Sequence, residues 1–159
     1  MEQDMEKVIV LDLDLCCGCE SCLAACMQSH WGEPRIRHGH IAGQAHLPSA
    51  CRHCEDPLCV ASCPTEALVK DEETGVVVHR PFLCVGCQSC TFACPFGVIQ
   101  QYLERHIATK CDYCQERDGG PRCVASCSSF ALKYISVDEL PKVPLNDRFI
   151  SRSASWRRQ

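Results

Sequence analysis

The 159-residue sequence is poor in aromatic side chains and has no long apolar run. Five Phe, three Tyr and two Trp are its only aromatic residues, so side-chain burial alone predicts a weak hydrophobic core. No stretch reaches the roughly 18 apolar residues of a transmembrane helix, so no membrane span of its own is expected. Residues 1–7 are acidic, with neither a secretory apolar segment nor a twin-arginine leader, which predicts a cytoplasmic protein.

Signatures of catalysis and of nucleotide binding are also missing. The sequence has no G-x-G-x-x-G or P-loop pattern, no H-E-x-x-H, no G-x-S-x-G and no C-x3-C-x2-C radical motif. The formal net charge is −4, without a basic stripe in the cysteine-rich region, so nucleic acid is not expected as a partner. We therefore do not expect the chain to be an enzyme on its own.

Cysteine is what the sequence has in excess, with 17 residues. Motif one, Cys16–Cys26, has the spacing C-x2-C-x2-C-x3-C, and motif three, Cys84–Cys94, has the same spacing followed by Pro. Motif two, Cys51–Cys63, is spaced C-x2-C-x4-C-x3-C-P. Motif four has a C-x2-C pair at 111–114 and a C-x3-C pair at 123–127. In a reducing compartment such a density of cysteine indicates metal rather than disulfides.

The motifs repeat one another. Cys-Val-Ala-Ser-Cys occurs at 59–63 and again at 123–127, and Gly-Cys-Glu-Ser-Cys at 18–22 resembles Gly-Cys-Gln-Ser-Cys at 86–90. Motif one is thus like motif three and motif two like motif four, as expected of a duplicated unit. The C-x2-C-x2-C-x3-C-P run is typical of paired [4Fe-4S] clusters, in which the fourth cysteine binds the other cluster. The sequence therefore predicts two dicluster units with four [4Fe-4S] clusters and a role in electron transfer.

Neighbouring motifs give the expected ligand sets. Motifs two and three are adjacent and make one unit, so motifs one and four must pair across the chain. The last cysteine of each motif lies on a departing turn or helix and is expected to reach the partner cluster. The predicted sets are Cys16, Cys19, Cys22 and Cys127 for cluster one; Cys26, Cys111, Cys114 and Cys123 for cluster two; Cys51, Cys54, Cys59 and Cys94 for cluster three; and Cys63, Cys84, Cys87 and Cys90 for cluster four. The alternative is that each motif completes its own cluster.

The expected fold is α+β, with two bacterial dicluster-ferredoxin-like units in which short hairpins and short helices surround four cubane clusters. Apolar alternation predicts strands at 8–15 and 130–135, a hairpin at 67–79, and extended structure or a short hairpin at 98–108. The expected parts are an outer unit at 1–27 plus 98–140, an insertion loop at 28–50, an inner unit at 51–97 and a basic tail at 141–159. We expect the tail to dock on an acidic partner surface, with a solvated tail as the alternative.

A few residues remain outside these sets. Cys17 is expected to be a small buried thiol, with a substitute ligand as the alternative. His53 lies inside a cluster loop and could hydrogen-bond a sulfur, whereas His38 and His40 are expected to be surface groups that complete no ligand set. A structural zinc protein is a remote alternative, because C-x2-C pairs also hold zinc. The close spacing of the third and fourth cysteines and the following prolines favour clusters.

Four segments are similar to the four-cluster iron–sulfur subunits of the dimethyl sulfoxide reductase type. They are Cys51–Leu68, Asp71–Gly75, Cys94–Gly97 and Lys110–Cys114, and the resemblance spans roughly Val8–Leu140. It implies a small electron-transfer subunit with a [4Fe-4S] chain, crossed ligation and a catalytic oxidoreductase partner. Ser128 stands where relatives have Pro, and Cys17 is unusual, so the resemblance does not extend to the potential of cluster one.

Relatives of this type serve molybdenum or tungsten pterin enzymes, including tungsten-dependent aldehyde oxidoreductases, as well as hydrogenases and carbon monoxide dehydrogenases. The resemblance favours a molybdenum or tungsten pterin enzyme of anaerobic metabolism as the catalytic partner. A hydrogenase or carbon monoxide dehydrogenase is the alternative. Electrons would pass on to ferredoxin, a second electron-carrier subunit or further copies of the chain.

Overall fold

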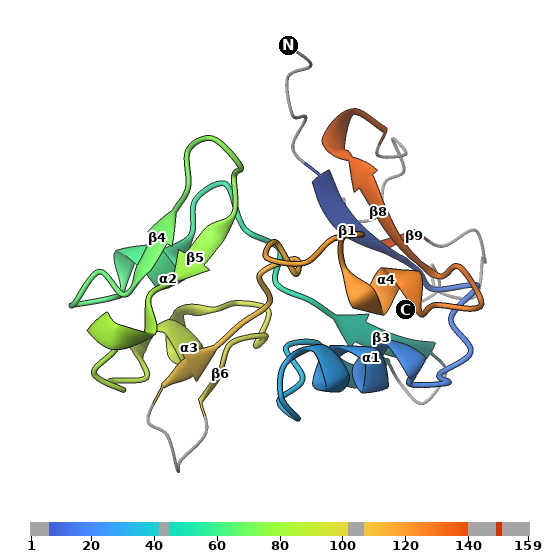
Figure 1. The fold of residues 1–159 in the computed structure, drawn as a ribbon, viewed down its shortest axis with the longest axis horizontal. Helices are drawn as coiled ribbons and strands as arrows, with labels where there is room; N and C mark the ends of the chain where they lie inside the picture. Colours follow the sequence, from blue (N-terminus) through green and yellow to red (C-terminus); the bar gives the residue numbers. More distant parts are fainter. Residues whose placement is uncertain (1–6, 42–44, 102–106, 140–148, 151–159) are drawn as a thin grey trace.

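Short strands and short helices carry the cysteine motifs in the computed structural model, which describes residues 7–41, 45–101, 107–139 and 149–150 (Figure 1). The longest helix has nine residues, and the other α-helices have four or five. A small α+β fold with short hairpins and helices is therefore confirmed. The elements are β1 (Lys7–Asp12), α1 (Ser21–Ser29), β2 (Arg37–Ile41), β3 (Ala45–Ser49), α2 (Leu58–Ala61), β4 (Leu68–Lys70), β5 (Val77–His79), η1 (Pro81–Leu83), α3 (Ser89–Ala93), β6 (Gln100–Gln101), β7 (Ala108–Thr109), α4 (Arg122–Ala125), β8 (Leu132–Ser136), η2 (Val137–Glu139) and β9 (Phe149–Ile150).

The largest sheet joins the two ends of the described chain, in the order β8-β1-β9. Its central strand has the run Val8–Leu11, which is buried and rich in the β-branched residues that favour strands. β8 runs antiparallel to β1, with Lys7 opposite Ser136, and β9 adds a parallel strand on the other edge. The strands expected at 8–15 and 130–135 are thus confirmed, with β1 ending at Asp12.

The elements fall into two groups that Figure 1 shows side by side. One contains the β8-β1-β9 sheet with α1 and α4, which pack on each other. The other contains the β4–β5 hairpin with α2 and α3, which also pack together. One buried cluster includes Leu11 and Leu132 of the first group together with Val76 and Val98, and Leu68 and Val77 belong to a second cluster. Helices of motifs one and four therefore meet, as do helices of motifs two and three.

The sequence repeat is also a repeat of backbone conformation. Gly18 and Gly86 have φ of 70° and 69°, and two residues later Glu20 and Gln88 have φ of 59° and 65°. These left-handed values are favourable for glycine but strained for other residues, so the same strained turn occurs before α1 and before α3. Motifs one and three thus share a loop geometry as well as a spacing.

Both predicted hairpins are present, as β4–β5 and as the shorter β6–β7 pair. The expectation of an irregular loop at 28–50 is wrong. This segment contains the end of α1 and a regular β2–β3 hairpin, with Arg37 opposite Ser49 and Ile41 opposite Ala45. Its sequence is dominated by His, Gly and Arg instead of the usual strand formers, so its pairing is not visible as a strand signal.

Among the described residues, no helix is long and apolar enough to cross a lipid bilayer. The tail prediction concerns 141–159, and apart from β9 that segment lies outside the described residues.

Candidate metal centres

The thiols predicted for cluster one come together from the two ends of the chain. Cys16 and Cys19 lie on the loop before α1, Cys22 lies in α1, and Cys127 follows α4. Burial raises the pKa of Cys22 to about 11, and the neighbouring thiolates of Cys127, Cys16 and Cys19 add to the rise. The backbone N–H of Leu132 donates to Cys127 Sγ at 3.4 Å. Cys127 thus lies near the three thiols of the motif-one loop.

The cluster-two thiols lie deeper in the same group of elements. Burial raises the pKa of Cys123 to about 12, with added contributions from Cys26 and Cys114. Cys111 is fully buried, which raises the pKa of its thiol well above the usual value, and Cys123 contributes to this rise. The backbone N–H of Arg35 donates to Cys26 Sγ at 3.1 Å. Cys26 thus joins the motif-four thiols rather than its own motif.

The cluster-three thiols combine motif two with the last cysteine of motif three. Burial raises the pKa of Cys59 to about 11, and Cys51, Cys94 and Cys54 raise it further. Cys94 is the residue that follows α3, on the departing turn where the fourth ligand is expected.

The cluster-four thiols, Cys63, Cys84, Cys87 and Cys90, line one cavity together. Burial raises the pKa of Cys90, and the thiolates of Cys84 and Cys63 contribute. The backbone N–H of Ala67 donates to Cys63 Sγ at 3.2 Å. Cys63 therefore faces the motif-three loop, again in the crossed arrangement.

All four predicted sets are brought together, and their chemistry fits the expected group. Each offers four thiols, and every one of the 17 cysteines is free of disulfides. Backbone N–H groups that point at sulfur stabilise thiolate ligands and tune cluster potentials. When bound, a [4Fe-4S] cubane supplies one-electron redox chemistry. The ligation of each cluster stays a prediction.

Two electrostatic effects link neighbouring sets of thiols. The Cys22 thiolate of set one contributes to the raised pKa of Cys123 in set two. The Cys51 thiolate of set three contributes to the raised pKa of Cys111 in set two. Helix α2, which carries Cys59 of set three, packs on α3, which carries Cys90 of set four. The thiol sets thus follow one another in the order one, two, three, four.

Lys110 is a functional candidate that the sequence analysis did not single out. Its side chain is only 3% exposed, and Nζ donates to the carbonyl oxygen of Cys111 at 2.9 Å and to that of Val77. The ammonium acts electrostatically on the thiols of both Cys59 and Cys111. A buried cation therefore lies between sets two and three, where it offsets thiolate charge. The sequence offers no signal for its burial, because lysine is usually exposed.

Two expectations about single residues change. Cys17 is exposed, so the prediction of a buried thiol is wrong. Its side chain lies beside the predicted ligands, because it raises the pKa of Cys16 and its hydrogen bond lowers the pKa of Cys19. His53 is buried, and its Nδ1 accepts a hydrogen bond from the backbone N–H of Val77 at 2.9 Å. Its ring packs on Tyr113 at 4.1 Å between centroids. That nitrogen therefore bonds the backbone and not a sulfur.

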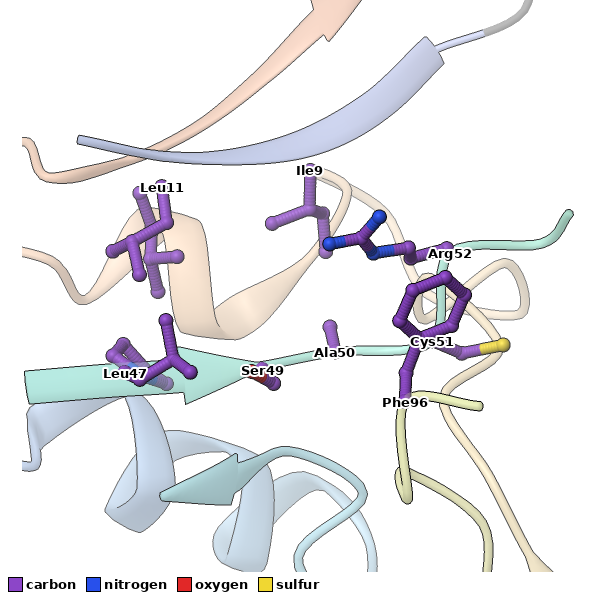
Figure 2. A pocket seen from close by; sticks show the side chains of 10 residues that line it. Ile9, Leu11, Leu47, Ser49, Ala50, Cys51, Arg52 and Phe96 are labelled. Atoms are coloured by element: carbon purple, nitrogen blue, oxygen red, sulfur yellow. The ribbon is translucent and has the colours of Figure 1, made fainter. Parts of the chain in front are cut away.

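A pocket marks where the β1 sheet, the β2–β3 hairpin and Cys51 meet (Figure 2). Ile9 and Leu11 of β1 line it together with Leu47 of β3. The guanidinium of Arg52 lies 3.9 Å above the ring of Phe96 at one end. Leu47 of β3 thus lies on the face of the hairpin that is turned toward β1.

Comparison with known proteins identifies a family. A family model described as a 4Fe-4S dicluster domain matches residues 43–136. A sulfite dehydrogenase subunit of Allochromatium vinosum is 31% identical over 84% of this chain and 70% of its own length. Electron transport protein HydN of Escherichia coli is 30% identical over 91% of this chain and 96% of its own length. A polypeptide of the anaerobic dimethyl sulfoxide reductase of Shigella flexneri is 35% identical over 83% of this chain and 74% of its own length.

The predicted resemblance to iron–sulfur subunits of the dimethyl sulfoxide reductase type is thereby confirmed. The relatives are electron transport proteins and polypeptides of oxidoreductases, and the chain is likewise an electron-transfer component of the oxidoreductase type. It belongs to the 4Fe-4S dicluster domain family of iron–sulfur electron-transfer proteins.

Proposed function

We propose that the chain passes single electrons through four [4Fe-4S] clusters between a catalytic oxidoreductase subunit and a second redox partner. The observation that carries the proposal is the continuous order of the thiol sets. The Cys22 thiolate raises the pKa of Cys123, and the Cys51 thiolate raises the pKa of Cys111, so sets one, two and three are close enough for direct electrostatic effects. Set four adjoins set three through the packing of α2 on α3. A linear series of redox centres suits conduction, whereas structural metal sites have no need of such proximity.

The proposed architecture has two dicluster units. The outer unit comprises residues 1–27 and 98–140 and would hold clusters one and two; the inner unit, residues 51–97, would hold clusters three and four. The pairing of β1 with β8 and the packing of α1 on α4 support the outer unit. The packing of α2 on α3 supports the inner one. The cluster ligands would be the four crossed sets described above.

Electrons would enter and leave at clusters one and four. Cys19 and Cys87, which belong to these sets, are exposed, and side-chain hydrogen bonds with Ser21 and Ser89, respectively, lower the pKa of the two thiols. The thiols of the sets between them, two and three, are buried or half-buried. Exposed ligands at both ends allow a partner's redox centre to come close without opening the fold.

The catalytic partner that we favour is a molybdenum or tungsten pterin enzyme, such as a tungsten-dependent aldehyde oxidoreductase. The names of two relatives, which refer to a dimethyl sulfoxide reductase and a sulfite dehydrogenase, support an oxidoreductase partner. A hydrogenase or carbon monoxide dehydrogenase is the alternative. The second partner would be ferredoxin, another electron-carrier subunit or a further copy of the chain.

The tail and the compartment complete the proposal. Residues 141–159 carry basic and apolar side chains and would dock on an acidic surface of the catalytic partner. Seventeen free thiols suit a reducing compartment, so we place the protein in the cytoplasm.

Anaerobic purification of the tagged chain from its native host tests the proposal. We expect a brown protein that dithionite bleaches, together with a co-purifying catalytic subunit that contains molybdenum or tungsten. Substrate of that subunit should then reduce the clusters. A colourless, zinc-loaded protein would overturn the cluster assignment, and clusters that stay oxidised during turnover of the bound enzyme would overturn the electron-transfer role.

A further inference from the structure

The β2–β3 hairpin carries three histidines on one face. His40 lies directly opposite His46, and His38 lies two residues before His40, so the three side chains share a face of the two-stranded ribbon. Their ring centroids are 5.3 Å apart for His38–His40, 5.6 Å for His38–His46 and 4.9 Å for His40–His46. Leu47, the next residue after His46, points to the other face and into the core (Figure 2).

The ring nitrogens are close enough for one ion. Each histidine offers one nitrogen, and the three nitrogens lie within 4.8 Å of one another. A tetrahedral zinc ion holds imidazole nitrogens at about 2.0–2.1 Å, which places them about 3.4 Å apart. A bound ion would therefore draw the three nitrogens together by up to about 1.4 Å. Of the three side chains, His40 is exposed, so an ion can reach the cluster from solvent.

One nitrogen of this cluster has no other partner. His46 Nδ1 is buried and makes no hydrogen bond to any residue in the described part of the chain. The opposite edge of the ring rests on Gly18, where an added Cβ would lie 2.3 Å from both Cε1 and Nε2. Nδ1 is therefore the nitrogen left for a ligand. An unsatisfied buried polar atom costs about 1–3 kcal/mol, and a bound ion would remove this cost.

A carboxylate stands beside the cluster. Glu20 Oε1 lies 3.7 Å from His38 Nδ1, and the carboxylate is more than half exposed. Carboxylates in this position commonly orient a metal-bound imidazole, and a carboxylate or water can also fill a fourth coordination position. The negative charge of Glu20 favours a cation at this place.

We propose that His38, His40 and His46 bind one divalent transition-metal ion of the zinc type, with Glu20 or water as the fourth ligand. Three imidazoles are the ligand type that zinc accepts in sites with an open position, and the ion is distinct from the iron–sulfur clusters. The site joins the hairpin to the loop of motif one, because the His46 ring rests on Gly18.

The site has a consequence for cluster one, and this part rests on the proposed function. Gly18 lies between Cys16 and Cys19, so a divalent ion on the hairpin adds positive charge next to the proposed cluster-one loop. Positive charge favours the more negative, reduced form of a cluster. Occupancy by zinc therefore raises the potential of cluster one relative to the zinc-free protein.

The test uses the cluster-loaded, full-length protein incubated anaerobically with one equivalent of zinc and then desalted. We expect about one zinc per chain, with X-ray absorption showing only N/O ligands at about 2.0–2.1 Å. Zinc trapped by empty cluster thiols would instead show sulfur at about 2.3 Å, which separates a failure of cluster assembly from a failure of this site.

Variants identify the ligands. H40A and H46A should each lose the retained zinc while the iron content stays at the wild-type value. R37A changes an exposed residue of the same strand on the alternate face and should keep the zinc. Retention of N/O-bound zinc by both histidine variants, or no retention by the cluster-loaded wild type, would overturn the proposal. A zinc-induced positive shift of one cluster potential in wild type but not in H40A would carry the link to cluster one, and an unchanged potential would remove it.

Discussion

Crossed ligation gives a prediction that iron content can decide. Four cubanes hold about 16 iron atoms per chain, so the loss of one cluster leaves about 12 and the loss of two leaves about 8. The structure places Cys63 with Cys84 in one cavity and Cys51 with Cys59 in another set. The double variant C63A/C84A should therefore remove one cluster only and retain about 12 irons. The double variant C63A/C51A should remove two clusters and retain about 8.

The opposite ligation reverses both numbers. If each motif completed its own cluster, Cys63 and Cys51 would share a cluster, and C63A/C84A would be the variant with about 8 irons. Iron should be measured per folded monomer after anaerobic size exclusion, together with the spin count of the fully reduced protein by EPR. C17A is the matched control, since this exposed thiol belongs to no predicted set, and it should keep about 16 irons. Equal iron in the two double variants would refute the reasoning.

Three other perturbations test separate features. Replacing the buried cation in K110M should shift the proposed cluster of Cys59 to a more negative potential. The shift is about 100 mV for one charge that acts over about 7 Å at an effective dielectric constant of about 20. A redox titration measures the potential, and K133M should leave it unchanged. In the β4–β5 hairpin, V77A should lower the free energy of unfolding by about 2 kcal/mol and V78A by less than about 0.5 kcal/mol, because Val77 is 1% exposed and Val78 is 37% exposed. Equal effects in a denaturant titration would contradict the packing. Deleting the residues after Pro141 should abolish co-purification with the catalytic partner, and a complex that survives the deletion would remove the tail from the interface.

The cysteine motifs predict the candidate centres well, because ligand spacing is a local constraint that a short loop must satisfy wherever it lies in the fold. Crossed pairing is a prediction from the same spacing, and Cys127 lies close enough to Cys22 to raise the pKa of that thiol. The strand at Val8–Leu11 is visible because its β-branched residues both favour extended backbone and fill a core.

The remaining features depend on packing that no local pattern encodes. The hairpin of His38 and His46 lacks strand-forming residues on its polar face, so only its pairing register gathers the histidines. Lys110 is buried because two groups of elements close around it, and a lysine in a sequence carries no mark of such a neighbourhood. Cys17 is exposed although it follows the predicted ligand Cys16 directly, and cysteine spacing does not determine which side chain of a loop is exposed.

The pairing of β1 with β8 also sets an order of assembly. The hairpin β4–β5 closes between Leu68 and His79, but the outer sheet closes only when Lys7 meets Ser136. The longer loop adds about 2 kcal/mol of closure entropy, and on the ribosome the outer sheet must wait for the end of the chain. An iron–sulfur scaffold could thus load the inner unit first. Until Cys127 emerges, the motif-one thiols lack the fourth thiol of predicted set one, and they are the thiols most open to oxidation during biogenesis.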